Sequence, residues 1–389
     1  MCETWPFEIE KENSKMKTAI ITLPLHTNYG GILQAYALKQ LLESMGHDVD
    51  VVDRKDKMPL PVWYKALFIY ASRTLKKIMK PSSGVEVFRE LNYRRELPLR
   101  AKHTQKFVDE HISPRLVSSY KNIHEGEYDA FVVGSDQVWR PRYFGNIEDA
   151  FLKFTKGWDV RRVAYAASFG TENLEYKYEE LDSCSRLLSE FDAVSVREDV
   201  GVKMCDEWFG YEDAFHVLDP VLMLDADVYR NLAKKSVNHS CEGKVMTYIL
   251  DPSKEKDCIV DFIARVSGKP VQPLSLEIRE VPPVEDWLAG FCDADFVVTD
   301  SFHGCVLSIL MHKPFVAVGN SVRGMSRMNS LLSMFGLDDR LVQGIDPEDD
   351  GEYWLAEPDW ESVDTELKTQ RQKSVEFLES VLKKEVTNG

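Results

Sequence analysis

The residues best placed to do chemistry follow the short apolar run 296–298. Asp300, Ser301 and His303 come directly after that predicted strand, and the apolar stretch 305–311 predicts a buried helix behind them. In an open parallel α/β sheet, ligands bind beyond the carboxyl ends of strands, where the next helix offers free backbone N–H groups to an anion. We therefore predict that His303 is catalytic, with capping or packing of the helix start as the alternative.

Two acids stand at the ends of predicted strands. Either Asp136 or Asp300 could act as a general base or orient His303, although Asp136 could equally cap the turn that follows it. Trp139 is near Asp136 in the sequence. Its ring could form a platform for a sugar, or it could pack at a domain edge.

Three arginines could bind an anion. Arg197 ends a predicted strand, and its planar guanidinium can donate two parallel hydrogen bonds to a carboxylate or phosphate; a salt bridge to Glu198 or Asp199 is the alternative. Arg323 and Arg327 are one helical turn apart after another predicted strand, so they share a helix face. A solvated helix start would explain them equally well.

The first recognisable unit is a strand, a glycine turn, a helix and a second strand. The strand 18–23 leads to Gly30 and Gly31, which let the turn bring its backbone close to a ligand or to the sheet. An apolar stripe predicts a helix that stops near Gly46, and valines resume the sheet at 49–52. The glycines spell neither a dinucleotide fingerprint nor a P-loop.

Composition excludes several classes of protein. The chain has 389 residues, 44% of them hydrophobic, and 64 acids against 48 bases leave a formal charge of −16, which opposes nucleic-acid binding. The seven cysteines are scattered without C-x-x-C spacing, so we expect reduced thiols and no metal site. Residues 1–16 do not resemble a signal peptide, and no apolar run is long enough to span a membrane.

Two successive α/β alternations predict two Rossmann-like domains facing across a cleft. The first domain covers 17–220 and contains a helical insertion at about 54–125, where prolines are frequent and β-branched strands are missing. The second covers 244–345, after a crossing segment at 220–243. A helix at 361–386 is expected to pack back on the first domain.

The segment 61–80 differs electrostatically from the rest of this acidic chain, because it carries five bases and no acid. At about 100° per residue, its bases fall on one arc of a helix and its apolar residues on the other, the pattern of an interfacial helix. We expect contact with an anionic membrane surface. A helix docked on its own protein would show the same pattern.

Six blocks in order resemble the polysaccharide pyruvyl transferase family. They are NYGGILQAYAL from Asn28, YDAFVVGSDQVW at 128–139, AYAASFG at 164–170, VSVRE at 194–198, LDPVLML at 218–224 and TDSFHG at 299–304. Together they span about 17–340, leaving out the insertion and the tail.

The resemblance implies a GT-B-like pair of Rossmann domains and transfer of a pyruvyl group from phosphoenolpyruvate to a sugar, usually as a cyclic ketal across two hydroxyls. It implies that His303 is catalytic and that Arg197 binds the donor. The scattered cysteines indicate a cytoplasmic protein. Acceptors of the family are commonly assembled on lipid carriers at the cytoplasmic face, so the enzyme is expected in the cytoplasm and can lie at the inner face of the membrane. Members with an Arg-Leu-His sequence at this turn place an arginine where this chain has Ser301, and Arg323 or Arg327 could replace it.

We therefore assign the site residues by role. His303 and Asp300 are expected to be catalytic. No cofactor and no metal are expected, and phosphoenolpyruvate is the donor substrate. Donor binding is assigned to Arg197, Ser301, Gly304, Arg323, Arg327, Gly30 and Gly31. Acceptor binding is assigned to Asn28, Asp136, Trp139 and Ser168. A GT-B glycosyltransferase using a nucleotide sugar, or a non-catalytic member of the fold, is the alternative.

Overall fold

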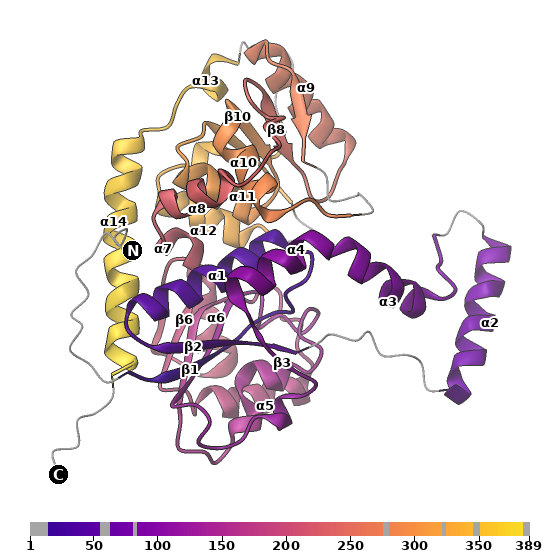
Figure 1. Cartoon of the computed structure of the whole chain (residues 1–389), viewed down its shortest axis with the longest axis vertical. Coiled ribbons are helices and arrows are strands. Elements are labelled where there is room, and N and C mark those ends of the chain that lie inside the picture. The colour runs from indigo at the N-terminus through magenta and orange to yellow at the C-terminus, as the bar shows by residue number, and fades with distance from the viewer. Residues whose placement is uncertain are drawn as a thin grey trace.

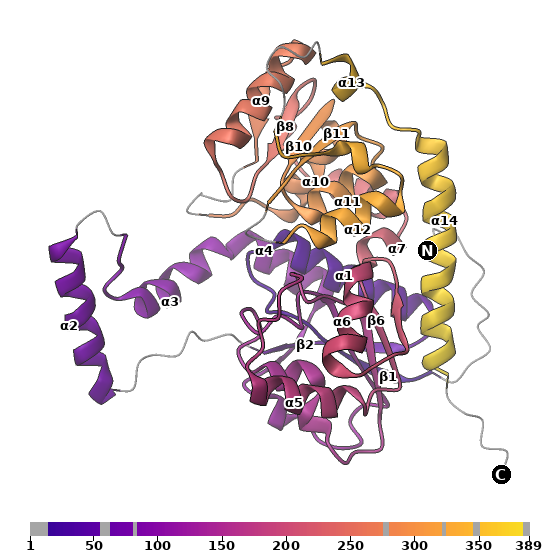
Figure 2. The same cartoon turned by 180° about the vertical axis from the view of Figure 1, so that it is seen from behind.

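The chain folds into two α/β halves, one above the other in Figure 1 and in the reverse view of Figure 2. The computed structural model describes residues 15–54, 63–80, 84–274, 280–320, 324–344 and 351–383. Two all-parallel sheets with alternating helices confirm the predicted GT-B-like pair of Rossmann-like domains.

The first sheet has seven described strands in the order β3-β2-β1-β4-β5-β6-β7. They are β1 (Lys17–Ile21), β2 (Asp48–Arg54), β3 (Arg115–Val117), β4 (Ala130–Asp136), β5 (Arg161–Ala167), β6 (Ala193–Val196) and β7 (Ala214–His216). All seven residues of β4 are buried, as expected for a parallel strand covered on both faces. The order reverses between β1 and β4, so a ligand is expected beyond the ends of these two strands.

The second sheet has five described strands in the order β12-β11-β10-β8-β9. They are β8 (Val245–Tyr248), β9 (Val271–Pro273), β10 (Phe296–Thr299), β11 (Phe315–Val318) and β12 (Leu341–Val342). Its order reverses between β8 and β10. The segment that contains His303 therefore begins at the switch point of this sheet.

Helices cover both sheets. Those of the first half are α1 (Tyr29–Ser44), α2 (Trp63–Met79), α3 (Arg89–Arg100), α4 (Lys102–Phe107), α5 (Tyr178–Leu188) and α6 (Asp199–Phe209), with short 3₁₀ or π turns at Val108–Ile112, Tyr120–Asn122, Ile147–Phe151 and Lys153–Thr155. The remaining helices are α7 (Pro220–Met223), α8 (Ala226–Ala233), α9 (Lys254–Ser267), α10 (Val284–Asp293), α11 (Phe302–Leu310), α12 (Ser326–Met334), α13 (Glu352–Leu355) and α14 (Trp360–Val381), with a 3₁₀ turn at Asp338–Arg340.

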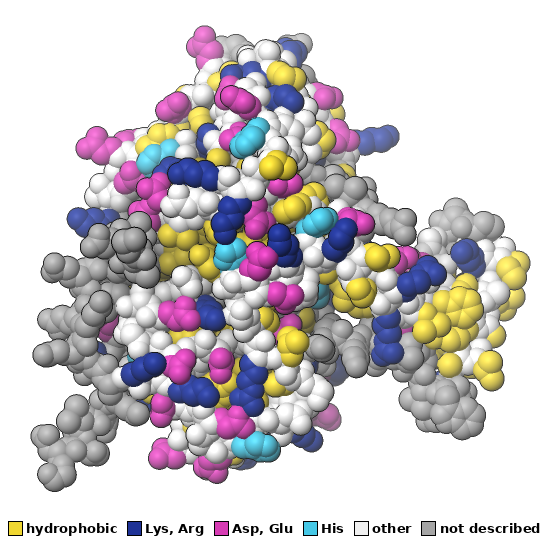
Figure 3. All heavy atoms as spheres, viewed as in Figure 1, with side chains coloured by type: hydrophobic (Ala, Val, Ile, Leu, Met, Phe, Trp, Pro, Cys, Tyr) yellow, Lys and Arg dark blue, Asp and Glu magenta, His cyan; other side chains and the backbone are white. Residues whose placement is uncertain are grey.

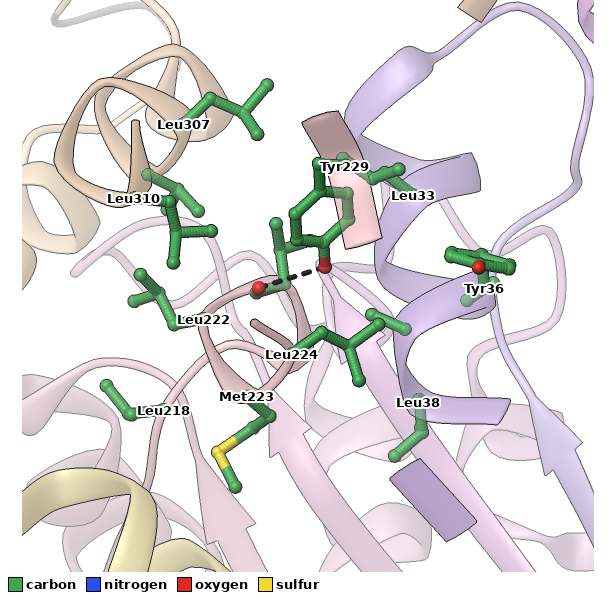
Figure 4. Close-up of a cluster of buried hydrophobic side chains, with 14 of the residues drawn as sticks. Leu33, Tyr36, Leu38, Leu218, Leu222, Met223, Leu224, Tyr229, Leu307 and Leu310 are labelled. Atoms are coloured by element: carbon green, nitrogen blue, oxygen red, sulfur yellow. Dashed lines mark hydrogen bonds between the residues drawn. The ribbon is translucent and has the colours of Figure 1, made fainter. Parts of the chain in front are cut away.

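One apolar core joins the two halves. Helix α1 has no charged residue before Lys39, and residues 29–38 are all buried, so α1 can lie between the halves. Figure 4 shows side chains of α7 between those of α1 and α11, and the Tyr229 hydroxyl donates a hydrogen bond to the Val221 carbonyl at 2.9 Å. Because this core is continuous, it fixes the position of α1 relative to α11.

Helix α14 runs along one flank of the molecule, beside both halves (Figures 1 and 2). Arg371 donates hydrogen bonds to the carbonyls of Leu222 and Leu224 at 2.6 and 2.5 Å, and Ser374 accepts one from the Leu218 backbone at 3.0 Å. Near its start, Trp360 stacks on His312 of the second half. The helix thus ties the crossing segment and both halves together.

The region 54–125 differs in part from the helical insertion that we expected. Its described part contains the helices α2, α3 and α4, but also β3, which pairs in parallel with β2 and forms the edge of the first sheet. Three residues are too short a strand to stand out from loop sequence. No described helix combines the length and the apolar character that a membrane span requires.

Candidate active site

The switch points of the two sheets face each other across one polar pocket. Its walls come from the turn before α1, the end of β4, the ends of β8 and β10, and the first turns of α11 and α12. The lining residues are Asn28, Gly30, Asp136, Gln137, Tyr248, Leu250, Asp300, Ser301, Phe302, His303, Asn320, Gly324, Arg327 and Met328. Both halves therefore contribute side chains to a single site.

His303 lies in the first turn of α11 and is buried. The turn is fixed locally, because the Ser301 hydroxyl accepts a hydrogen bond from the Gly304 backbone N–H at 3.4 Å, as a helix cap does. From the other half, α1 packs its first turn against the imidazole: a Cβ added to Gly30 would lie 2.1 Å from His303 Nδ1. Gly30 is therefore needed for the close approach of α1 to His303.

The carboxylate nearest to His303 is Asp219. Its Oδ2 lies 3.6 Å from His303 Nε2, and its Oδ1 accepts a hydrogen bond from the Val221 backbone at the start of α7. Burial alone would raise the pKa of Asp219, but His303 and then Arg197 outweigh it and hold that pKa well below its usual range. Asp219 is thus an ionised carboxylate positioned to stabilise a protonated imidazole.

Arg197 lies between two buried carboxylates. Its guanidinium is 2.7 Å from Asp219 and 3.1 Å from Asp136, and it stacks over the Phe302 ring with 4.4 Å to the centroid. Burial opposes the charge of all three ionised groups. The mutual attraction nevertheless raises the pKa of Arg197 and, together with His303 and Arg327, lowers the pKa of Asp136.

Arg327 brings a second guanidinium to the same place from α12. It is buried and lines the pocket, and its guanidinium lies 5.8 Å from the centroid of the Phe302 ring, the ring that Arg197 also contacts. Burial, followed by the charge of Arg197, lowers the pKa of Arg327 to about 10. An anion bound in the pocket would therefore stabilise the charged form of Arg327.

Residues 28–322 match the sequence profile of the family described as polysaccharide pyruvyl transferase. The chain belongs to this family. The match covers the turn at Asn28, both switch points and the segment around His303, and it confirms the resemblance seen in the sequence. Family membership makes the protein a transferase of polysaccharide biosynthesis. None of the curated proteins matches the chain.

Several solved structures are similar to this chain at low sequence identity. UDP-GlcNAc 2-epimerase from Neisseria meningitidis has 10% identity and a TM-score of 0.49, with 94% of this chain and 100% of that chain covered. The same epimerase from Methanocaldococcus jannaschii has 11% identity, a TM-score of 0.43 and coverage of 91% and 93%. MurG from Acinetobacter baumannii has 10% identity, a TM-score of 0.41 and coverage of 95% and 99%.

The pocket gathers many of the residues that the sequence singled out. These are Asn28, Gly30, Asp136, Asp300, Ser301, His303 and Arg327. Arg323 lies outside the described residues. Residues of this transferase that are far apart in sequence thus meet beyond the strand ends, as predicted.

Asp300 is held by its own half and does not orient His303. Its carboxylate accepts hydrogen bonds from the backbones of Leu250 and Asp251 at 2.6 and 3.1 Å, and it pairs with Lys256 at 2.6 Å. A further bond comes from the Asn320 amide at 2.9 Å. Because four donors occupy the carboxylate, Asp300 fixes the pocket wall, and we no longer assign it the role of a base.

Three predicted donor-binding residues have local structural roles. Arg197 does not line the pocket, since its side chain lies among carboxylates behind Phe302. Gly304 lets α11 approach β10, because a Cβ there would lie 2.3 Å from Thr299 Oγ1. Gly31 faces the side chain of Asn28, which a Cβ would meet at 2.9 Å.

Two predicted acceptor residues are buried away from the pocket. Trp139 is fully buried, stacks on Phe151 and donates its indole N–H to the Ala150 carbonyl at 3.2 Å. Ser168 donates a hydrogen bond to Glu198 at 2.8 Å and accepts one from the Gly170 backbone. Both residues shape the first domain, because their polar groups are already bonded within it.

Asp219 is a site residue that we did not predict from the sequence. The Asp219-Pro220 pair predicts a helix cap, and one oxygen of Asp219 does cap α7. The other oxygen faces Arg197 and His303, and no local sequence pattern predicts that second contact. A signal existed nonetheless, because Asp219 is an acid shortly after the end of β7, as Asp136 is at the end of β4.

Proposed function

We propose that this family member transfers the pyruvyl group of phosphoenolpyruvate to two hydroxyls of a sugar. The C2–O bond to phosphate breaks, two C2–O bonds to the sugar form, and a cyclic ketal and inorganic phosphate result. Of the two hydroxyl protons, one ends on the donor methylene carbon, which becomes a methyl group, and the other ends on phosphate. The reaction consumes no oxidant and no reductant.

The observation that carries the proposal is the pairing of His303 with Asp219 in a pocket that also holds Arg327. A protonated His303 can give its proton to the methylene carbon, which makes C2 electrophilic, and the Asp219 carboxylate 3.6 Å away stabilises the imidazolium. Arg327 can bind the phosphate or carboxylate of the donor through its fork. It then supplies the cation that Ser301 does not.

The acceptor is expected to approach the same pocket. Asn28 and Asp136 line its first-domain wall and remain our candidates for binding the sugar hydroxyls. We propose a polysaccharide precursor carried on a lipid as the acceptor, handled at the cytoplasmic face of the membrane. The chemistry at C2 is the same for a free or a lipid-linked saccharide.

The test separates donor binding from turnover. Phosphoenolpyruvate should raise the melting temperature of the parent protein and of His303→Ala, while His303→Ala lowers phosphate release with a competent acceptor by about 10²–10⁴-fold. Arg327→Ala should weaken donor binding measured by calorimetry. Arg230→Ala, which removes a partly exposed arginine on α8, is the control and should behave as the parent.

Two results would overturn the proposal. Unchanged phosphate release by His303→Ala would remove its catalytic role. Protection by a nucleoside diphosphate, with none by phosphoenolpyruvate, would identify a GT-B glycosyltransferase that uses a nucleotide sugar.

A further inference from the structure

Helices α2 and α3 form an arm that stands away from both halves of the molecule in both views (Figures 1 and 2). Large apolar side chains of α2 are left in solvent over most of their surface. Their exposed fractions are 78% for Leu67, 79% for Phe68, 58% for Leu75, 69% for Ile78 and 74% for Met79. Figure 3 shows hydrophobic side chains, in yellow, on the surface of the projecting lobe.

The arm has an internal structure that leaves this face open. Arg73 of α2 makes two hydrogen bonds of 2.8 Å to Glu90 at the start of α3, and Glu90 is buried by the contact. Tyr70 packs edge to face on Phe88 with 5.0 Å between the ring centroids. The side of α2 that faces α3 is thus already bonded, and the apolar face points elsewhere.

Lysines border the apolar face on both sides. At about 100° per residue, the residues from Leu67 to Met79 that make up the patch fill an arc of about 120°. Lys65 and Lys76 lie beyond one edge of this arc, and Lys77 lies beyond the other. All three are exposed, and residues 61–80 contain no acid. Long cationic side chains beside an apolar stripe are the arrangement of helices that lie in a lipid interface.

A second copy of the chain is a poorer partner for this face. Two arms packed face to face would bring their own lysines together, and like charges repel. Phe88, Leu91 and Leu99 are also exposed but belong to the arm, whereas the large exposed apolar side chains of described residues outside the arm come from separate elements. They are Leu116, Tyr143, Leu174, Tyr178, Phe215, Val237 and Tyr353. Among the described residues, the large exposed apolar side chains outside the arm are thus scattered and form no group like the one on α2.

We propose that the arm docks the protein on anionic membranes, with α2 in the plane of the lipid headgroups. Leu67, Phe68, Leu75, Ile78 and Met79 enter the acyl boundary, and Lys65, Lys76 and Lys77 bind lipid phosphates. The whole chain has a formal charge of −16 although residues 61–80 contain five bases and no acid, so the rest of the protein is repelled by the same surface and docking occurs through the arm alone. This inference rests on α2 and does not depend on the proposed function.

The experiment is co-sedimentation of the full chain with vesicles of phosphatidylcholine, alone or mixed equally with phosphatidylglycerol. We expect binding to the anionic vesicles only, and weaker binding as salt is added. Leu67→Asn with Phe68→Asn should abolish it, and Lys76→Gln with Lys77→Gln should weaken it by about fivefold per lysine. The matched controls are Tyr178→Asn with Val237→Asn and Lys121→Gln with Lys156→Gln, all exposed residues off the arm.

A second measurement keeps the proposal open to refutation if a variant folds poorly. The parent has eight tryptophans, including Trp63 at the start of α2, and serves as the reference. Relative to the parent, Phe68→Trp should add blue-shifted emission with anionic vesicles and added quenching by brominated acyl chains, whereas Tyr178→Trp should add neither. The proposal is overturned if no binding occurs at low salt, or if the controls lose as much binding as the arm variants. It is also overturned if Leu67→Asn with Phe68→Asn converts a stable dimer to a monomer, because a second copy then covers the face.

Discussion

At the residue scale, the feature that most changes the expectations from sequence is the cluster around Arg197. The sequence predicted a donor contact, because an arginine at a strand end suits an anion. The structure places two buried carboxylates, Asp136 and Asp219, within 3.1 Å of its guanidinium. Arg197 thus binds two carboxylates of the protein itself. Removal of the Arg197 side chain would leave both carboxylates buried without this cation.

We predict that Arg197→Ala chiefly destabilises the fold. Breaking a buried ion pair by removing one partner costs about 3–5 kcal/mol of unfolding free energy near pH 7. In the parent, the pKa values of Asp136 and Asp219 are lower in the folded than in the unfolded state. The two carboxylates therefore add to the free energy of unfolding above the unfolded pKa of about 3.9, and this addition is lost as the pH falls below it. Without Arg197, His303 is the cation that still opposes burial at both carboxylates. We expect burial to prevail in the variant and to raise both pKa values, so stability should fall as the pH rises from about 4 to 7.

Urea unfolding of parent and variant at several pH values checks this prediction. The stability deficit of Arg197→Ala should be largest near neutral pH and should narrow toward pH 4. Arg197→Lys keeps one charge and should recover part of the difference. A deficit that stays constant across this range would mean that the carboxylates do not depend on Arg197.

At the element scale, the sequence predicted the strand ends well, because each depends on a local pattern. An apolar β-branched run followed by a polar turn placed Asp136 and His303 at the edges of their sheets, and both line the pocket. The sequence could not show which edges meet. The contact between Asp219 and His303 depends on how the crossing segment packs α7 between α1 and α11, a long-range arrangement without a local signature.

The same limit explains the other misses. A tryptophan near a strand end can face a ligand or a core, and only the packing of Trp139 on Phe151 decides between them. For α2, the amphipathic pattern was visible, but docking on its own protein would give the same pattern. Exposure of Leu67 and Phe68 excludes the packed alternative. For both Trp139 and α2, the burial of the side chains in the folded structure decided between the alternatives, and burial cannot be read from the local sequence.

The approach of α1 to α11 gives an element-scale prediction. Gly30→Ala places a methyl group where His303 Nδ1 would be 2.1 Å away, so the imidazole or the start of α11 must move. A displacement near 1 Å can lower turnover by about 10²-fold. The fold should survive, since alanine favours a helix over glycine by about 0.5–1 kcal/mol.

Gly201→Ala in the first turn of α6 is the control, because its Cβ would meet Val196 at 3.2 Å and not a pocket residue. We expect phosphate release to remain near the parental value in this variant. Parental turnover by Gly30→Ala would show that His303 tolerates displacement, and the contact between α1 and α11 would then have only a packing role.

At the scale of the whole molecule, charge is distributed unevenly. Around the pocket the charges nearly balance, because three buried bases are matched by three buried acids. The bases are Arg197, Arg327 and Lys256, and the acids are Asp136, Asp219 and Asp300. The formal charge of −16 therefore dominates the long-range field, while the arm is locally positive. The proposed anionic donor would therefore meet repulsion as it approaches, whereas the proposed anionic lipid surface would attract α2.

Salt should therefore affect turnover of phosphoenolpyruvate and binding to anionic vesicles in opposite directions. Screening lengths shorten to about 10 Å at 0.1 M salt, so repulsion of phosphoenolpyruvate by the acidic surface weakens, and its kcat/KM should rise about two- to fivefold between about 0.01 and 0.15 M salt. Vesicle binding should fall over the same range. Phosphate-release kinetics in potassium chloride and in potassium glutamate would separate screening from competition by chloride at the pocket. A kcat/KM that falls equally in both salts would mean that Arg327 and its neighbours, and not the net charge, control the approach of the donor.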